Sequence, residues 1–198
     1  MPTRAPDAAL EARRRGFGVY VRTPRREDAR AFLRAVAASR GLHRGWVRPP
    51  TTPTEFAVYL ARFAGARSRD PARATNSGFL VCRVDDDTPV GVLNLSEIVR
   101  GCFCSAYLGY YGLAPHAGQG HMTEGLALLL EVAFRRFRLH RIEANVQPSN
   151  LRSIALVRAA GFVREGYSRR YVKVAGRWRD HERWAILVED WRARRGRP

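Results

Sequence analysis

The fold of this chain is decided by one stretch, which begins His116-Ala-Gly-Gln-Gly-His-Met-Thr-Glu124. A long amphipathic segment follows, then His140-Arg-Ile-Glu-Ala-Asn-Val146, and the stretch ends Pro148-Ser-Asn-Leu-Arg-Ser153. Behind its two glycines, apolar residues recur at helical intervals: Leu126, Leu129, Leu130, Ala133, Phe134 and Phe137. This spacing predicts an α-helix with one buried face that is entered through glycines.

The glycines at the predicted helix entry, Gly118 and Gly120, point to a binding site for an anion. The first N–H groups of an α-helix have no partner within the helix, and the helix dipole adds partial positive charge there. Phosphate groups bind at such ends, and glycine lets the backbone come close to them. The loop therefore predicts a phosphate-bearing cofactor, although a Gly-x-Gly before a helix also occurs as an ordinary loop.

The residues after the helix predict a strand and then a second helix. Arg141 to Val146 alternates, with its apolar residues on one face, as in a half-buried strand. After Pro148, Ser149 or Asn150 can cap a short helix that closes at Gly161. The predicted order is strand, helix, strand, helix, strand.

These motifs resemble the GNAT acetyltransferases. The resemblance rests on Gly118-Gln-Gly120, Asn145, Asn150-Leu-Arg-Ser153 and Gly161-Phe162. The longer strings look most like the RimJ/RimL branch, which acetylates the N-terminal α-amines of ribosomal proteins; they are Leu139 to Ser153, Gly161 to Tyr167, Trp178-Arg-Asp-His181 and Glu189-Asp-Trp191. The resemblance covers most of the chain from about Val19 onward.

The resemblance implies an α+β GNAT fold. The expected architecture is a single, mostly antiparallel central sheet of about seven strands, splayed at a CoA-binding cleft and flanked by about four helices. We expect a mobile arm over residues 1–15, one domain over 16–192 and a basic tail over 193–198. Local patterns place strands at 17–23, 78–84, 90–99 and 102–111, a helix after Arg25, a helix over 54–65, and a loop over 41–53 that holds Trp46.

Composition sets bounds on partners and compartment. The formal net charge is +17, carried almost entirely by arginine, because Lys173 is the only lysine. Such a charge favours anionic partners such as CoA phosphates or ribosomal RNA, but scattered solvated charge is an equal alternative. No apolar run is long enough to span a bilayer, and the N-terminus lacks the apolar segment of a signal peptide. We expect a cytoplasmic protein, without membrane contact, that is a monomer or a homodimer.

The three cysteines, Cys82, Cys102 and Cys104, suit a reducing compartment. Without further ligands at suitable spacing they favour burial over metal binding. We therefore expect no metal site.

By resemblance, the cofactor is acetyl-CoA, released as CoA. Its diphosphate is expected on the backbone N–H groups of Ala117, Gly118, Gln119, Gly120, His121, Met122 and Thr123. Ala117 and Met122 depart from the family pattern at its two ends, but backbone donors perform the binding. The extended chain at Leu113 and Ala114 is expected to pair with pantetheine and to supply an oxyanion donor. Asn145 and Asn150 complete the expected cofactor contacts; Asn150 could equally be a plain helix cap.

Catalytic roles transfer less completely. Ser153 matches a serine near the thiol in this branch and could protonate the departing sulfur, or it could be a solvated helix serine. Val157 stands where other members of the superfamily carry a tyrosine acid. The branch's glutamate base aligns near Val172, so we place the base at Glu97 instead, with a surface carboxylate as the alternative. Glu143 is the next choice but is expected to pair with an arginine.

The acceptor side is also expected by resemblance. Trp46, Arg48, Tyr107 and the Trp178–His181 segment are acceptor-side candidates, of which we single out Trp46, Tyr107 and Trp178 for substrate binding; each could also be a packing or surface residue. The leading hypothesis is acetylation of a protein N-terminus, of the ribosomal-protein alanine type. The alternatives are a small-molecule amine, such as an antibiotic or polyamine, and a non-catalytic ribosome- or RNA-binding protein.

Overall fold

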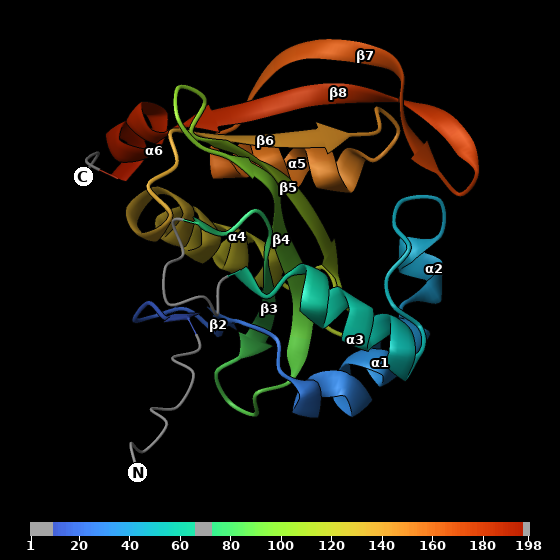
Figure 1. The fold of residues 1–198 in the computed structure, drawn as a ribbon. Coiled ribbons are helices and arrows are strands. Elements are labelled where there is room, and N and C mark those ends of the chain that lie inside the picture. The colour runs from blue at the N-terminus through green and yellow to red at the C-terminus, as the bar shows by residue number, and fades with distance from the viewer. Residues whose placement is uncertain (1–9, 66–72, 196–198) are drawn as a thin grey trace.

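The predicted central helix is present in the computed structural model, which describes residues 10–65 and 73–195 (Figure 1). This helix, α4, spans His121–Glu131 and continues as a π-helical segment, η4, over Val132–Arg136. Gly120 caps its start with φ of 84°, in the left-handed region that glycine adopts without strain. All six apolar residues of the predicted stripe are buried, which confirms the helix and its inner face.

The helix packs on one open sheet with the strand order β1-β2-β3-β4-β5-β6-β8-β7. Only β5 and β6 are parallel; every other neighbouring pair is antiparallel. The described residues thus confirm the mostly antiparallel splayed sheet, with eight strands where about seven were expected. The strands are β1 Glu11–Ala12, β2 Val19–Arg22, β3 Ser77–Arg83, β4 Pro89–Val99, β5 Ser105–Gly112, β6 Arg141–Val146, β7 Val163–Val174 and β8 Arg177–Leu187.

The described residues form six α-helices, two more than the approximate number expected. Besides α4 they are α1 Ala29–Ala38, α2 Arg40–His43, α3 Pro53–Arg62, α5 Leu151–Ala160 and α6 Val188–Arg195, and a 3-10 turn, η1 Arg26–Asp28, precedes α1. The α2 helix overlaps the first residues of the stretch 41–53 that was predicted as a loop, and this part of the prediction was wrong. Four residues are too few to show a helical period, so α2 leaves no pattern in the sequence.

Helices cover both faces of the sheet, because the central strands are apolar on both sides (Figure 1). In β3, Phe79 and Val81 belong to the core that contains α4, whereas Leu80 and Cys82 belong to the core under α1 and α3. The α4 helix lies close to the sheet at Gly125, where an added Cβ would stand 2.8 Å from the methyl carbons of Val81. This approach sets the position of the amino end of α4.

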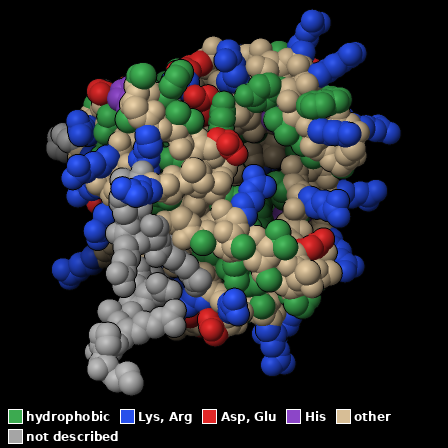
Figure 2. Space-filling model, viewed as in Figure 1, with side chains coloured by type: hydrophobic (Ala, Val, Ile, Leu, Met, Phe, Trp, Pro, Cys, Tyr) green, Lys and Arg blue, Asp and Glu red, His purple; other side chains and the backbone are tan. Residues whose placement is uncertain are grey.

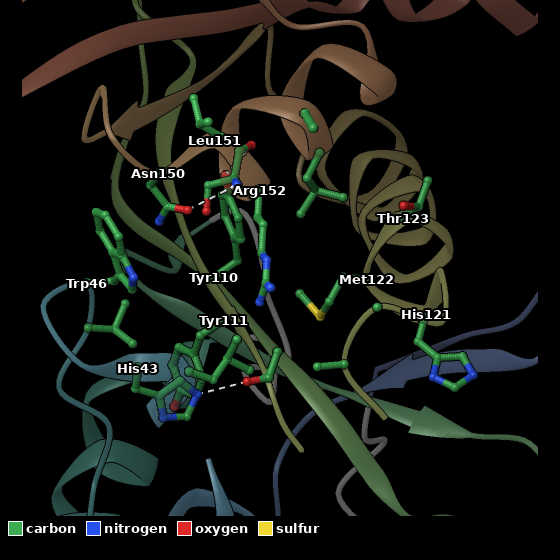
Figure 3. A pocket seen from close by; sticks show the side chains of 18 of the residues that line it. His43, Trp46, Tyr110, Tyr111, His121, Met122, Thr123, Asn150, Leu151 and Arg152 are labelled. Atoms are coloured by element: carbon green, nitrogen blue, oxygen red, sulfur yellow. Dashed lines mark hydrogen bonds between the residues drawn. The ribbon is translucent and has the colours of Figure 1, made fainter. Parts of the chain in front are cut away.

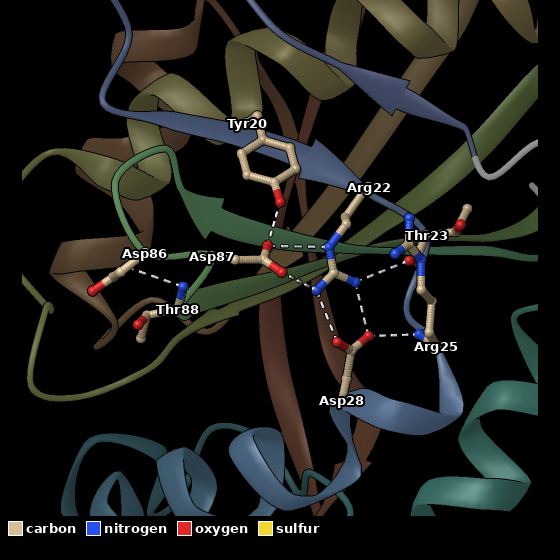
Figure 4. A network of polar contacts seen from close by, with 8 residues as sticks. All are labelled: Tyr20, Arg22, Thr23, Arg25, Asp28, Asp86, Asp87 and Thr88. Atoms are coloured by element: carbon tan, nitrogen blue, oxygen red, sulfur yellow. Dashed lines mark hydrogen bonds and ion pairs between the residues drawn. The ribbon is translucent and has the colours of Figure 1, made fainter.

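A buried polar network holds the start of α1 against the sheet (Figure 4). The Arg22 guanidinium, almost inaccessible to solvent, donates two hydrogen bonds of 2.8 Å to the Asp28 carboxylate. It also donates a hydrogen bond to the Asp87 carboxylate, in the turn between β3 and β4. The same carboxylate accepts a hydrogen bond from the Tyr20 hydroxyl. Burial opposes ionisation of Asp87, but the bonds from Tyr20 and Arg22 prevail and lower its pKa. The network thereby fixes the amino end of α1.

The two chain ends lie only partly within the described residues. Residues 1–9 of the expected arm and 196–198 of the expected tail lie outside them. Of the remainder, Glu11 and Ala12 pair with β2, and residues 193–195 belong to α6. Among the described residues, no helix has the length and apolarity that crossing a membrane requires.

Candidate active site

The candidate active site opens where β5 and β6 separate. The two parallel strands pair only from Ser105 with Arg141 to Tyr107 with Glu143, and beyond that point they diverge. A cavity of about 1030 Å³ lies beside the far end of β5, bounded by the Trp46 segment, the glycine loop and the start of α5 (Figure 3). This volume is at the upper end of the roughly 300–1,000 Å³ of ordinary ligand pockets, so the cavity suits a large ligand.

The structure gathers most of the predicted cofactor residues around this one cavity. Its lining includes Trp46, which was predicted for substrate binding, and the predicted cofactor residues Ala117, Gly118, Gly120, His121, Met122, Thr123, Asn150 and Ser153. These residues come from three separate parts of the sequence. The lining does not include Gln119, which is exposed on the loop, or Asn145, which lies on β6.

The glycine loop presents unpaired backbone donors to the cavity. Gly118 and Gly120 both have φ of 84°. The N–H groups of Thr123 and Glu124 turn back to the carbonyl of Gly120 and close the first turn of α4. Within the part of the chain that the structure describes, the N–H groups of residues 118–122 donate to no other protein group. Unpaired amides at the positive end of a helix fit the diphosphate of CoA, although the Thr123 amide is occupied.

The start of α5 forms the facing wall. The Asn150 side-chain oxygen accepts a hydrogen bond of 3.2 Å from the Ser153 amide, so Asn150 is the helix cap, and its side-chain amide nitrogen stays available. The Ser153 carbonyl accepts a hydrogen bond of 3.1 Å from the Tyr110 hydroxyl. Burial raises the pKa of Tyr110 to about 12, so this hydroxyl remains a donor at neutral pH. Tyr110 therefore fixes the turn that carries Ser153.

The backbone donors expected at Leu113 and Ala114 are not free. The Leu113 N–H donates to the carbonyl of Val90 at 2.8 Å, and the Ala114 N–H donates to the Ser39 hydroxyl at 2.8 Å. The Leu113 amide instead extends the hydrogen-bond ladder between β4 and β5. The prediction that these two amides are free to bind pantetheine or an oxyanion was therefore wrong. Because backbone groups alternate along a strand, the amides of Tyr110 and Gly112 face away from β4, toward the opening.

A histidine that the sequence analysis did not single out holds this end of β5. His43, on α2, is 5% exposed, and its Nε2 donates to the carbonyl of Gly112 at 2.8 Å. Its ring stands edge-on to Tyr111, with 5.1 Å between ring centroids. Only the tertiary contact reveals His43. Tyr110 could have been found from sequence, because the alternation of the strand predicted over 102–111 continues to it.

Glu97, the predicted base, does not reach the cavity. It lies near the irregularity between Ser96 and Val99 in β4, has φ of 49° and is exposed. The cavity contacts β4 at Val90, near the opposite end of that strand. The bulge turns Glu97 outward, a change that simple strand alternation does not reveal. We therefore withdraw Glu97 as a candidate base.

The remaining acceptor-side candidates lie outside the cavity. Tyr107 is on β5 at the last pair before the strands diverge, and Trp178 is 60% exposed beside the turn between β7 and β8. Arg48 is exposed in the segment after Trp46. Glu143 accepts a hydrogen bond of 2.9 Å from Arg141, which is the pairing expected of it.

The electrostatic character of the cavity suits a polyanion. No carboxylate is present among its lining residues, whereas Arg152 extends into it from α5 (Figure 3). Lysine and arginine side chains project all around the visible face, which is hollowed near its centre, rather than in one patch (Figure 2). The described residues contain no group of three or more histidine, cysteine or acidic side chains placed to hold a metal ion.

Fold and site agree with a comparison against known families. The model described as Acetyltransferase (GNAT) domain matches residues 19–163, and the chain belongs to this family. A probable N-acetyltransferase, YjcK of Bacillus subtilis, is 42% identical over 112 residues, which are 57% of this chain and 62% of that protein. The [Ribosomal protein uS5]-alanine N-acetyltransferase of Escherichia coli is 40% identical over 107 residues, 54% of this chain and 55% of that enzyme. The chain thus matches less than two thirds of either relative.

Solved structures match over more of the length. The Mycobacterium smegmatis RimJ in complex with CoA-disulfide has a TM-score of 0.78 and 30% identity, covering 91% of this chain and 87% of that one. The ribosomal-protein-S5-alanine acetyltransferase from Vibrio fischeri also has a TM-score of 0.78, at 23% identity, covering 93% and 98%. The first supports the RimJ/RimL-like branch of the family, and the second shows the shared fold.

Proposed function

We propose that this protein transfers the acetyl group of acetyl-CoA to an amine, and that the amine is the N-terminal α-amine of a protein. The observation that carries the proposal is the row of unpaired amides over residues 118–122, at the start of α4 and beside the cavity. Family membership supports the reaction type. The names of the Escherichia coli and Vibrio fischeri relatives support an α-amine acceptor.

The residues have separate tasks in this reaction. The amides of 118–122 hold the diphosphate, and those of Tyr110 and Gly112 face the opening, where they can bind pantetheine or an oxyanion. Asn150 caps α5 and offers its amide nitrogen to the cofactor. The Ser153 hydroxyl lies on the cavity wall and can donate a hydrogen bond to sulfur. When bound, the cofactor supplies an acetyl thioester, the electrophile for the amine.

The absence of a carboxylate among the cavity's lining residues favours an α-amine acceptor. An α-amine titrates near 7.7–8.0, so roughly a quarter is neutral at about pH 7.4, against about one part in a thousand for a lysine. A lysine acceptor would need a stronger base. A polyamine would need anionic partners, and the net charge of +17 would repel it.

A steady-state assay tests the proposal directly. The purified protein, acetyl-CoA and a peptide that begins with alanine should release thiol, and mass spectrometry should locate the acetyl group on the α-amine. The same peptide with a blocked N-terminus and an internal lysine is the control and should not react. Binding of RNA without binding of acetyl-CoA would instead identify a non-catalytic, RNA-binding member of the fold.

A further inference from the structure

A cluster of polar side chains lies on the sheet face that turns away from α5. Ile142, Ala144 and Val146 of β6 pack in the core shared with α5, so Glu143 and Asn145 face the other side. Tyr107 is paired with Glu143 and shares that face. The next residue of β6 on the face is Asn145, just beyond the last pair of β5 and β6. The cluster therefore begins where the two strands separate.

His181 belongs to this cluster through the register of β8. Asn145 pairs with Arg183, so His181, two residues away, is a diagonal neighbour of Asn145 on the same face. Diagonal neighbours lie about 7–8 Å apart, within reach of each other's longer side chains. The Asn145 side-chain oxygen is buried and, among the described residues, has no hydrogen-bond partner. An unpaired buried oxygen of this kind is a ready acceptor for a ligand N–H group.

A bulge in β7 aims Tyr171 at the same histidine. Ser168 pairs with His181 and Val172 with Arg179, so β7 carries extra residues between the two pairs. The Tyr171 ring stands edge-on to the His181 ring, with 6.2 Å between centroids. Bulges occur often beside active sites, where they redirect a side chain.

Asp180 holds this bulge in place. Its carboxylate accepts a hydrogen bond of 2.7 Å from the Arg170 amide and one of 2.6 Å from the Tyr167 hydroxyl. Arg170 has φ of 47°, a conformation that an arginine keeps only when neighbouring contacts maintain it. On the far side of the bulge, the hydrogen bond of Tyr107 with Tyr171, followed by burial, raises the pKa of Tyr107 to about 12. The Tyr107 hydroxyl therefore stays protonated at neutral pH.

The His181 imidazole has one defined protonation pattern. It is 5% exposed, and its Nδ1 lies 3.0 Å from the carbonyl oxygen of Arg179, which can only accept a hydrogen bond. Nδ1 therefore carries the proton, and Nε2 keeps its lone pair. Burial lowers the pKa of the ring, against the opposing effects of the Arg179 carbonyl and Asp180. The other groups near it are Ser168 and Tyr171 on β7, Asn145 on β6 and Arg183 on its own strand.

We propose that this cluster is the acceptor-amine site and that Nε2 of His181 accepts the proton which the amine releases. The proposal rests on the acetyl transfer proposed above. The amine nitrogen uses its lone pair to form the C–N bond, and the C–S bond breaks with its electron pair leaving on sulfur. The nitrogen's proton passes to Nε2 of His181 and then to solvent. The sulfur takes a proton from water, either directly or through the Ser153 hydroxyl, which water reprotonates.

The test compares His181→Asn with wild type on an alanine-starting peptide. The asparagine amide keeps a donor for the Arg179 carbonyl but removes the base. A positioned general base contributes about 100-fold or more, so kcat/KM should fall on the order of 100-fold with unchanged affinity for CoA. Below neutral pH, kcat/KM of wild type should fall with protonation of two groups, the acceptor amine and His181. In His181→Asn it should fall with protonation of the amine alone. His140 is exposed and directly precedes β6. His140→Asn is therefore the matched control and should behave as wild type.

A second measurement does not depend on turnover or on the variant folding. Nitrogen-15 NMR of wild-type protein should show His181 neutral and protonated at Nδ1 at neutral pH, and adding the peptide to the CoA complex should shift the Nε2 resonance. Three results would each overturn the proposal: a wild-type kcat/KM in His181→Asn, a proton on Nε2 of His181 at neutral pH, or an Nε2 resonance that does not shift when the peptide is added. Failure of wild type to bind CoA or to acetylate any amine would instead overturn the proposed function itself.

Discussion

The two sides of the proposed reaction centre use different groups of the protein, backbone amides on one side and side chains on the other. The cofactor side consists of backbone amides over residues 118–122 and the first turn of α5, each set by local sequence. The acceptor side consists of side chains from β5, β6, β7 and β8, which only strand register brings together. A backbone site recognises a group common to every CoA ester, whereas a side-chain site can change its acceptor by single substitutions. The contrast predicts that mutations will separate cofactor affinity from turnover.

The largest expected effect is on the cofactor side, in Gly120→Val. The substitution strains a residue with φ of 84° and places a side chain at the proposed phosphate site, so the Kd for CoA should rise about 100-fold. Gly176→Val is the matched control, because Gly176 has φ of 80° in the turn after β7 and is equally open. Calorimetry should find normal CoA affinity in the control. Equal losses in both variants would contradict a phosphate site at the loop.

A smaller effect, confined to the chemical step, is expected at Ser153. Ser153→Ala should lower kcat about tenfold, as expected for loss of one hydrogen bond of about 1.4 kcal/mol to the reacting group, with CoA affinity unchanged. Single-turnover kinetics and calorimetry measure the two quantities separately. Ser96→Ala, on β4 away from the cavity, is the control. Full turnover in Ser153→Ala would remove this serine from the thiol side.

Asn150 should affect binding and stability together. Asn150→Ala loses a helix cap worth ~1 kcal/mol, which lowers the Tm by about 2–4 °C in a domain of this size. It also loses the amide donor, so CoA affinity should fall about fivefold, or ~1 kcal/mol. Asn150→Asp keeps the capping oxygen but not the donor. Normal thermal stability with weakened CoA binding in Asn150→Asp would confirm both roles, and normal binding would leave only the cap.

The smallest expected effect is the pH dependence of stability contributed by His181. Burial lowers its pKa in the folded state below the ordinary value near 6.5, so in that interval the unfolded chain binds more protons. The free energy of unfolding should therefore fall as the pH drops from about 6.5 through the lower folded pKa, by less than ~1.4 kcal/mol for each pH unit. His181→Asn should lack this component in urea titrations. Parallel curves for the two proteins would show an unshifted histidine.

Sequence alone went furthest where structure is local. The α4 stripe, the Gly120 entry, the Asn150 cap and the Gly161 stop all follow from the identity and spacing of nearby residues, and each is observed. Strand bounds were found to within a few residues for the same reason. The short helix α2 escaped because four residues carry no periodic signal. Its anchor, the bond from His43 to Gly112, joins residues 69 positions apart.

Errors at the site came from backbone details that a strand pattern does not carry. Leu113 and Ala114 were placed correctly along the chain, but their amides are taken by Val90 and Ser39. Glu97 was chosen as a substitute base, with a surface carboxylate as the alternative, and it lies exposed at the bulge in β4. Irregularities of this kind shift which face a side chain occupies, so one unnoticed bulge reverses a functional assignment.

What the sequence by itself determined is the local structure of the proposed cofactor wall, because glycine conformations, helix starts and helix caps depend on residues a few positions apart. Only the tertiary structure decided the proposed acceptor wall and the position of His181 within it. Its members meet through the register of four strands and through a bulge that redirects one tyrosine. Register depends on the packing of the whole sheet, and no short stretch of sequence contains that information.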